Sequence, residues 1–389
     1  MIALTNGTLY TPREKISNAT LVIDNGKIRA IESTVQRPMS NVQIIDARHH
    51  AIIPGLIDLH TFGCLGAQLT TPERAADDLA AIARNVARFG VTAFLISPPM
   101  GDPDFIARML GAIADAIPRA CEGARCLGIH LEGPYLDPEQ RGAFPRDCLR
   151  EPNAAEMARW VDAARGFLKI VTLAPNLPGA EAVANLLHAR GIIASLGHTR
   201  AEYATARDAL SPRGNFSLVT HLFNAMTGLH HRAPGVVGAA LEADAPALLI
   251  NDGAHVHPAV VKIILRATGI EKIILVTDAI AGAGMRDGEF ELFGQRVTVR
   301  DGRATLADGT LAGSTLTLNR AVMNARDFAQ IDLGDAVRMA TRNPARVLNL
   351  DARGELRVGA DADIVVMHEE TGEVKLTMVA GKVVYENDE

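Results

Sequence analysis

Aromatic residues and cysteines are both scarce in this chain. Phe, Trp and Tyr make up 4% of the 389 residues, which disfavours the stacking platforms that bind single-stranded nucleic acid. The 39 Lys and Arg set against 45 Asp and Glu give a formal net charge of −6, so the basic face that binds phosphate backbones is also missing. Four cysteines without Cys-x-x-Cys spacing, in a chain this long, predict reduced thiols rather than a disulfide framework. They are Cys64, Cys121, Cys126 and Cys148.

Long apolar runs are also absent. No stretch approaches the roughly 18 consecutive apolar residues that a membrane span requires, and the start shows no cationic patch followed by an apolar run. We therefore expect a cytoplasmic protein with no membrane or nucleic-acid partner. The hydrophobic content of 48% is enough for a full core and excludes general disorder. Of the classes of protein considered, a globular protein remains, and most simply an enzyme.

The two ends of the chain share one pattern, and the middle has another. Residues 1–50 and the C-terminal stretch alternate apolar and polar positions between turn signals such as Asn25-Gly26, which favours a hairpin. Between them, short β-rich runs alternate with helical patterns such as residues 73–89, which stop before Gly90. The β-rich runs are residues 52–60, 91–97, 126–132, 168–174, 192–198, 218–222, 247–252 and 273–278.

This alternation predicts an α/β fold, a (β/α)₈ TIM-like barrel with a small β-sandwich domain formed by antiparallel strands from both chain ends. We assign residues 1–52 and 350–389 to the β domain and residues 53–349 to the barrel. A doubly wound sheet also holds eight strands, but no Gly-x-Gly-x-x-Gly follows the first run. Residues 280–313, rich in Gly and Asp with a β-like pair near 290–299, predict a lid or binding element.

Polar residues of metal-binding or acid/base type end several of the predicted strands. Because the carboxyl ends of barrel strands meet on one face, we expect these side chains to gather there. Glu132, His198 and His221 would offer one divalent cation, zinc or iron, a carboxylate and two imidazoles. Asp278 could carry a proton from water to a leaving amine, and His255 could donate to the carbonyl oxygen. Metal-assisted hydrolysis is the chemistry that this set predicts.

Each of these residues also has a structural explanation. Taken alone, His198 or His221 would more often be a hydrogen-bonded core histidine than a ligand, and Asp278 could cap the segment that follows. Glu132 is harder to explain in this way, because a carboxylate that ends an apolar run needs a partner. His60, at the end of the first run, is open between a structural and a functional role. The histidines that we expect to pack or to face solvent are His130, His230, His231 and His257.

Several motifs occur in an order that is typical of a known family. Residues 54–60 (Pro-Gly-Leu-Ile-Asp-Leu-His) resemble the motif that opens the barrel in the amidohydrolase superfamily, and residues 354–366 resemble its return to the β domain. Five further motifs resemble those of the N-acetylglucosamine-6-phosphate deacetylase family: residues 130–134, 197–199, 220–226, 276–279 and 311–314. The resemblance covers nearly the whole chain. It implies a barrel enzyme, commonly a homodimer, that removes acetate from an N-acetyl-amino-sugar 6-phosphate.

The resemblance also implies a role for individual residues. Glu132, His198 and His221 match the metal ligands, Asp278 the acid/base, and His255 the group that polarises the acetyl carbonyl. The cofactor implied is one divalent metal ion, with zinc first and iron as the alternative. The positions that match contacts to the sugar phosphate are Asn224, Ala225 and Arg232, the arginine reaching in from the partner subunit, where its planar fork suits a phosphate. Further substrate-lining positions are Gln68, Ala143, Leu311, Ala312 and Gly313.

Two positions depart from the family pattern. Phe62 stands where many members have the second histidine of a His-x-His pair and bind a second metal, so we expect one tightly held metal here. Phe144 stands near the sugar site where the family usually has a histidine. N-acetylgalactosamine 6-phosphate, or another N-acyl amine or cyclic amide, therefore stays open as the alternative to N-acetylglucosamine 6-phosphate. A catalytically inactive binding barrel is the non-enzymatic alternative.

Overall fold

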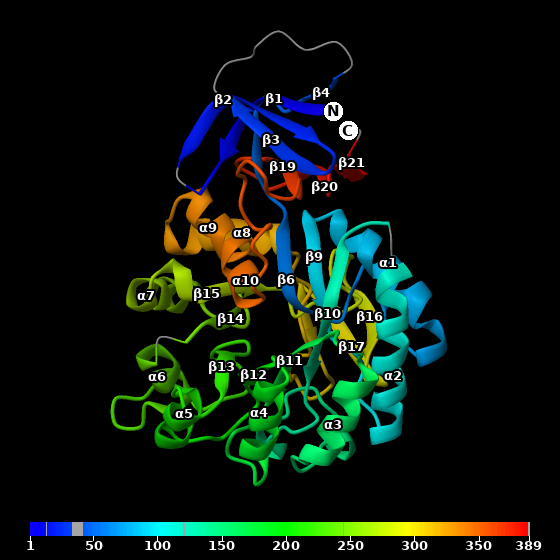
Figure 1. Ribbon diagram of the computed structural model, residues 1–389. Coiled ribbons are helices and arrows are strands. Elements are labelled where there is room, and N and C mark those ends of the chain that lie inside the picture. Colours follow the sequence, from blue (N-terminus) through cyan, green and yellow to red (C-terminus); the bar gives the residue numbers. More distant parts are fainter. Residues whose placement is uncertain (13, 33–41, 120–121, 244, 388–389) are drawn as a thin grey trace.

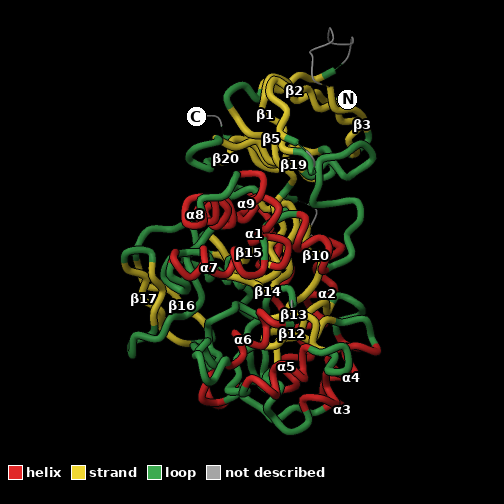
Figure 2. Tube along the Cα trace, turned by 90° about the vertical axis from the view of Figure 1, so that its left-hand side faces the viewer, coloured by secondary structure: helices red, strands yellow, loops and turns green. Residues whose placement is uncertain are grey.

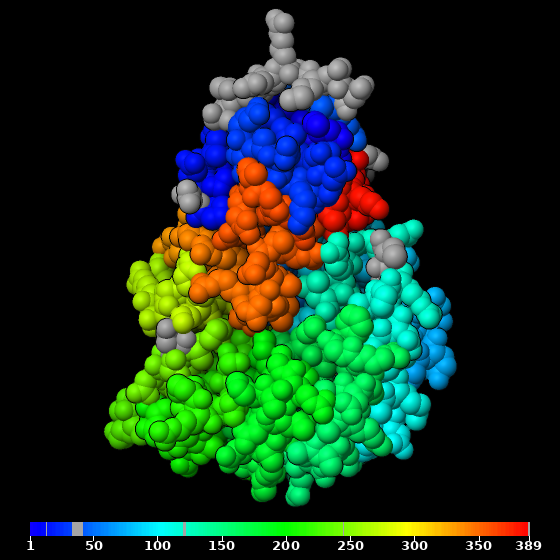
Figure 3. Space-filling model, in the orientation of Figure 1, coloured from blue at the N-terminus to red at the C-terminus, as the bar shows by residue number. Residues whose placement is uncertain are grey.

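The computed structural model describes residues 1–12, 14–32, 42–119, 122–243 and 245–387. A small β region, which contains both ends of the chain, lies on top of a larger α/β body (Figures 1 and 3). Cys64, Cys126 and Cys148 are free thiols, and Cys121 lies outside the described residues. Every helix in the described ranges is too short or too polar to cross a membrane.

The larger body is built on eight parallel strands that are neighbours in chain order. They are β6 (Leu56–Thr61), β9 (Val91–Ile96), β10 (Arg125–Glu132), β11 (Leu168–Leu173), β12 (Ile193–Leu196), β13 (Phe216–Val219), β14 (Ala247–Ile250) and β15 (Ile273–Val276). The ring closes because the Asp278 amide donates to the His60 carbonyl over 2.9 Å and Thr61 forms a parallel bridge with Ala279. The predicted barrel is therefore confirmed, and the open doubly wound sheet is excluded.

Helices surround this ring of strands (Figure 2). They are α1 (Ala75–Ala87), α2 (Pro103–Ala116), α3 (Ala154–Ala163), α4 (Ala180–Ala189), α5 (Tyr203–Leu210), α6 (Gly235–Glu242), α7 (Pro258–Thr268), α8 (Leu318–Ala329), α9 (Leu333–Met339) and α10 (Arg342–Val347). Short 3₁₀ turns are η1 (Pro72–Arg74), η2 (Ile117–Arg119), η3 (Pro138–Gln140), η4 (Arg146–Cys148) and η5 (Ile270–Lys272). Every residue of β6, β9, β14 and β15 is buried, because helices cover the outer face and side chains fill the interior.

Both chain ends contribute to one eight-stranded sheet in the β region. Its strands are β1 (Ile2–Tyr10), β2 (Lys15–Asp24), β3 (Lys27–Glu32), β4 (Gln43–Asp46), β5 (His50–Pro54), β19 (Ile364–His368), β20 (Val374–Val379) and β21 (Lys382–Glu386). The sheet encloses a hydrophobic cluster of its own, which includes Leu21, Ile52 and Met378. Most of its pairs are antiparallel as predicted, but β1 pairs in parallel with β4 and β5.

The predicted first run, residues 52–60, is two strands in different sheets. β5 pairs with β19 in the end sheet, whereas β6 opens the barrel. The chain crosses between them at Gly55, where a Cβ would lie 2.1 Å from Thr92 Oγ1, so only glycine fits there. The division into a β domain of residues 1–52 and 350–389 and a barrel of residues 53–349 stays our proposal, with Gly55 as the crossing point.

The segment after β15 carries a small sheet beside the barrel (Figure 2). β16 (Gly288–Leu292), β17 (Gln295–Arg300) and β18 (Arg303–Thr305) are antiparallel neighbours, so the β-like pair predicted near residues 290–299 is confirmed. A second short hairpin, β7 (Gly63–Cys64) with β8 (Ala67–Gln68), follows β6.

Candidate active site

Three polar side chains of the barrel mouth stand in short turns just beyond their strands. His198, His221 and Asp278 each lie two residues after the last residue of β12, β13 and β15. Their φ angles are 48°, 29° and 50°, in the left-handed region that residues other than glycine rarely adopt. Such a conformation costs about 1–3 kcal/mol per residue and persists only where the surrounding structure holds it. A left-handed backbone conformation therefore positions each of these three side chains.

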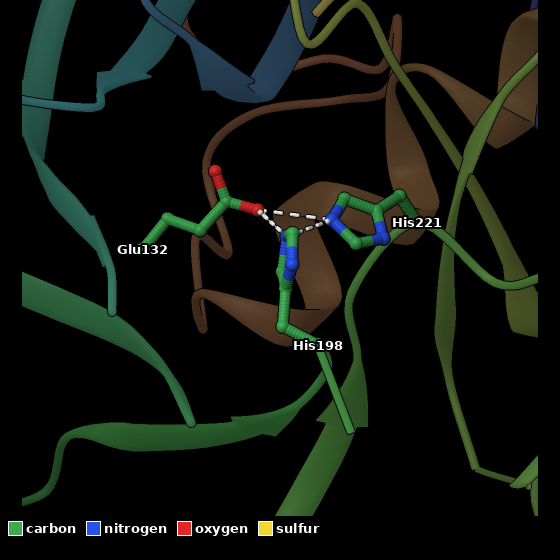
Figure 4. A group of neighbouring side chains, drawn as sticks. All are labelled: Glu132, His198 and His221. Atoms are coloured by element: carbon green, nitrogen blue, oxygen red, sulfur yellow. Dashed lines mark hydrogen bonds and ion pairs between the residues drawn. The ribbon is translucent and has the colours of Figure 1, made fainter. Parts of the chain in front are cut away.

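Glu132, the last residue of β10, meets two of these histidines (Figure 4). Its Oε1 lies 3.0 Å from His198 Nε2 and 2.9 Å from His221 Nε2, and the two nitrogens are 3.0 Å apart. His198 Nδ1 donates to the Gln140 carbonyl over 2.7 Å, which leaves its Nε2 with a lone pair directed at the carboxylate. Two lone-pair donors facing one another repel unless a proton or a cation lies between them. The three atoms therefore fit a divalent cation, for which carboxylate and imidazole are suitable ligands.

The charge state of Glu132 agrees with this fit. Burial alone would raise the pKa of its carboxyl group, but His60, His198 and His221 together hold that pKa well below its ordinary value. Glu132 is 3% exposed, so its charge is compensated inside the protein rather than by solvent.

His60, whose role the sequence left open between structural and functional, lies in the same cluster of side chains. Its fully buried ring places Nε2 3.1 Å from Asp278 Oδ1 and 3.3 Å from Glu132 Oε2, while Nδ1 lies 2.8 Å from Ser97 Oγ. Burial lowers the pKa of His60, but the charges of Glu132 and Asp278 outweigh it and raise the pKa to about 10. His60, Glu132 and Asp278 form a second group of side chains that could hold a cation, sharing Glu132 with the first. A single metal stays a prediction.

His255 stands in the loop after β14 and is oriented by a neighbouring carboxylate. Its Nδ1 lies 2.7 Å from Asp252 Oδ2, and Asp252 Oδ1 accepts from the backbone amides of Ala254 and His255 over 2.8 Å each. Burial lowers the pKa of His255, but the hydrogen bond and charge of Asp252 outweigh it and raise the pKa above its ordinary value. Asp252 was not singled out from the sequence, although its place three residues before His255 was a usable signal.

Glu132, His198, His221, His255 and Asp278 line one cleft of about 530 Å³, within the usual size range for small-molecule sites. His60 and Asp252 lie behind this lining. The residues predicted from the sequence that line it are Glu132, Ala143, His198, His221, Asn224, Ala225, His255, Asp278, Leu311 and Gly313. Three others lie outside its lining. Gln68 is in the β7–β8 hairpin, Ala312 is fully buried, and Arg232 is exposed on the loop between β13 and α6. The cleft of this one chain therefore gathers the predicted metal and acid/base residues but not the predicted arginine.

The four histidines that we expected to pack or to face solvent do one or the other. His130 is fully buried, with Nδ1 bonded to the Leu59 carbonyl and Nε2 to Thr172 Oγ1. The exposed His257 accepts the Ala259 amide at the start of α7. His230 and His231 are exposed, with ring centroids 4.2 Å apart.

Comparison with known proteins agrees with the fold. The model of the amidohydrolase family matches residues 51–384. An N-acetylglucosamine-6-phosphate deacetylase of Bacillus subtilis is 36% identical over 97% of this chain and 95% of its own length. An N-acetylgalactosamine-6-phosphate deacetylase of Escherichia coli is also 36% identical, over 92% of this chain and 93% of its own.

A solved structure extends this similarity to three dimensions. The crystal structure of N-acetylglucosamine-6-phosphate deacetylase from Pasteurella multocida superposes with a TM-score of 0.92 at 30% identity, covering 99% of this chain and 100% of that one. These matches span both the end sheet and the barrel. With the family model matched over most of the chain, they show that this chain belongs to the amidohydrolase family and, within it, to the N-acetylglucosamine-6-phosphate deacetylase family.

Proposed function

We propose that this enzyme removes acetate from an N-acetylhexosamine 6-phosphate, with N-acetylglucosamine 6-phosphate as its first substrate, and releases the amino-sugar 6-phosphate. The observation that carries the proposal is the convergence of Glu132, His198 and His221 on one point of a cleft that Asp278 and His255 also line. The substrate is taken from the activity named for the Bacillus subtilis relative.

Glu132, His198 and His221 would hold the metal ion, which we propose to be zinc, with iron as the alternative. When bound, the ion would lower the pKa of a water from 15.7 to about 7 and polarise the amide carbonyl. One of these ligands, His198, is oriented by a hydrogen bond from outside the site. The Gln140 carbonyl accepts a hydrogen bond from His198 Nδ1–H, so that Nε2, the ligating nitrogen, stays unprotonated.

Asp278 would be the acid/base. Its carboxylate takes a proton from the attacking water and returns it to the amine as the carbon–nitrogen bond breaks. Support comes from its place in the lining of the cleft and from His60, whose Nε2 lies 3.1 Å from Asp278 Oδ1. In this proposal Asp278 Oδ1 faces His60 and Oδ2 transfers the proton.

His255 would stabilise the negative charge that develops on the carbonyl oxygen. Because Asp252 can only accept, Nδ1 of His255 carries a proton, and Nε2 carries one as well when the ring is an imidazolium. The raised pKa of His255 favours that doubly protonated form. Its Nε2–H is then the donor to the oxyanion.

The sugar phosphate would lie against Asn224 and Ala225, with Arg232 as its guanidinium partner. Since Arg232 is exposed and outside the cleft of its own chain, we propose a homodimer in which each subunit lends this arginine to the other. Further contacts would come from Gln68, Ala143, Leu311, Ala312 and Gly313. We place the reaction in the cytoplasm, where the free thiols of Cys64 and Cys126 would stay reduced.

One experiment tests the reaction and its substrate. Purified, metal-loaded enzyme is given N-acetylglucosamine 6-phosphate, N-acetylgalactosamine 6-phosphate and unphosphorylated N-acetylglucosamine, and acetate release is followed. The galacto epimer is included because the Escherichia coli relative, named for it, is as similar as the Bacillus subtilis one. We expect the gluco phosphate to be the fastest. No acetate from any of the three would contradict the proposal, and equal rates with and without phosphate would remove Arg232 from it.

A further inference from the structure

Three phenylalanines form one continuous aromatic surface in the lining of the cleft. Phe144 and Phe293 are stacked, with ring centroids 4.6 Å apart and planes at 19°, and Phe62 meets Phe293 edge to face at 5.3 Å. All three line the cleft, in a chain in which aromatic residues are only 4%. Phe62 and Phe144 are 5% and 3% exposed, whereas Phe293 is half-buried and is the most accessible of the three rings. We call Phe62, Phe144 and Phe293 the aromatic wall.

The aromatic wall consists of three segments that are far apart in the sequence, and a hydrogen bond joins two of them. Phe62 follows β6, Phe144 lies in the loop after β10, and Phe293 stands at the tip of the β16–β17 hairpin. Gln295, beside that tip, donates from Nε2 to the Ala143 carbonyl over 2.6 Å. The hairpin is thus held against the loop that carries Phe144, and its tip forms one side of the cleft.

Phe293 stands where its turn does not favour it. Leu292 pairs with Gln295, so the hairpin turn consists of Phe293 and Gly294 alone, with φ angles of 52° and 74°. A two-residue turn with positive φ at both positions favours Asn-Gly, and a bulky aromatic side chain there is strained. The residue preference of the turn therefore does not explain why Phe293 is there. Its packing on Phe144 and its place in the cleft explain it.

The position of the wall relates it to the bond that is cut. The ring of Phe144 meets His198 edge to face at 5.5 Å, and Phe62 meets His60 at 5.3 Å. The wall therefore begins beside the proposed metal ligands, next to the substrate amide. Polar groups of the same lining include Asn224, His255 and Asp278, so the cleft offers both apolar and polar contacts.

A pyranose ring offers both kinds of surface, since C–H groups form its faces and hydroxyl groups its edge. Phe62 and Phe144 are almost fully buried, so Phe293 presents the accessible ring of the wall. The face of a pyranose covers such a ring more completely than the single methyl of an acetyl group does. Apolar contact with an aromatic face is favourable in a cleft that excludes water. We propose that the aromatic wall binds the C–H face of the hexosamine ring, with Phe293 as the residue that makes the closest contact. This inference rests on the proposed function and identifies what recognises the sugar.

The test compares two ligands that differ only in the acyl group. Metal-loaded Asp278→Asn protein, which cannot turn over, is titrated with N-acetylglucosamine 6-phosphate and with glucosamine 6-phosphate in a calorimeter, with and without Phe293→Asn. Because both ligands contain the ring, we expect both Kd values to rise by about 3- to 10-fold in the double variant, the range for losing one aromatic contact. The melting temperature is measured on the same proteins, because Asn-Gly suits the turn better than Phe-Gly whereas the packing of Phe293 on Phe144 is lost.

Two further variants serve as controls. Phe293→Tyr keeps the ring and should change both Kd values by no more than about twofold, within the spread of conservative substitutions. Phe105→Leu removes an aromatic ring from α2, outside the cleft, and should change neither Kd. Loss of affinity for the N-acetylated ligand alone would assign the wall to the acyl group and overturn the inference, as would unchanged Kd values for both ligands. If the protein with Phe293 intact bound neither sugar, the proposed substrate itself would be wrong.

Discussion

His255 Nδ1 lies 2.7 Å from Asp252 Oδ2, and the same carboxylate accepts the backbone amide of His255 through its other oxygen. The two residues are three positions apart in one loop, so the carboxylate sets both the orientation and the protonation of the ring. Burial would lower the pKa of His255, but Asp252 outweighs that effect and raises it. This pair therefore links the proposed chemistry to pH.

As pH rises, we expect the Asp252→Asn variant to lose activity at a lower pH than the wild type does. A donor at His255 Nε2 requires the imidazolium, so kcat/KM should fall as pH rises through the pKa of His255. Without Asp252, burial lowers that pKa, and the alkaline fall moves toward neutral pH. The measurement is kcat/KM between pH 6 and pH 9, with Asp77→Asn, an exposed carboxylate of α1, as the matched control. An alkaline limb at the same pH in all three proteins would remove the imidazolium from the mechanism.

Asp278→Asn should keep its metal and lose most of its turnover. The carboxamide fills the same space but cannot take a proton, and loss of a general acid/base typically lowers kcat by about 10²- to 10⁴-fold. Acetate release and metal content are measured on the same preparation. A fully active Asp278→Asn protein would mean that another group transfers the proton.

His198→Ala should lower the amount of metal bound after gel filtration, because one of three protein ligands is lost. Elemental analysis gives the metal per chain for the variant, the wild type and His188→Ala, which removes an exposed histidine of α4. The His188 variant should match the wild type. Unchanged metal content in His198→Ala would exclude this side chain as a ligand.

Arg232→Ala should raise KM for the phosphorylated substrate by about 10- to 100-fold, the range for losing a charge-assisted hydrogen bond. Hydrolysis of unphosphorylated N-acetylglucosamine should not change, and neither should the kinetics of Arg266→Ala, an exposed arginine of α7.

Mixing two weak variants tests whether the arginine comes from the partner subunit. In a mixed dimer of Arg232→Ala and Asp278→Asn, one of the two clefts has both an intact Asp278 and an intact Arg232 of the other chain. We expect activity to reappear on subunit exchange. No recovery, despite mixed dimers detected by mass spectrometry, would place the arginine in its own cleft or outside both clefts.

His130 should make folding stability depend on pH. Burial lowers the pKa of its ring, and the nearby charge of His60 lowers it further, to about 3. The unfolded chain takes up this proton below a pH of about 6.5, whereas the folded protein does not until about pH 3. Above pH 6.5 the ring is neutral in both states, and the free energy of unfolding does not change with its titration. As pH falls from 6.5 toward 3, the unfolded chain alone gains the proton, and the free energy of unfolding falls by about 1 kcal/mol per pH unit near pH 5. The free energy of unfolding is measured in urea at pH 7, 6 and 5, and it should fall more steeply with decreasing pH in the wild type than in His130→Gln. The same dependence on pH in both proteins would contradict this prediction.

The sequence alone determined the barrel and the kinds of residue at its mouth. Eight apolar runs separated by helical patterns leave few ways to bury both faces of every strand. Glu132, His198, His221 and Asp278 could be placed together in advance because the ends of parallel barrel strands converge whatever the details of packing. Helix ends were also readable, as at Gly90, whose φ of 80° ends the segment after α1.

Only the tertiary structure decided which of these side chains touch one another. His60 meets Asp278, 218 residues away in the chain, because β6 closes the ring against β15, and it meets Glu132, 72 residues away, at the end of β10. One sequence carries no periodic signal for either contact. The wall of Phe62, Phe144 and Phe293 depends on a hairpin turn that its own residues do not favour. Periodicity and turn preference are local, whereas a site is made of contacts between segments that packing brings together, so the chemistry could be predicted from the sequence and its geometry could not.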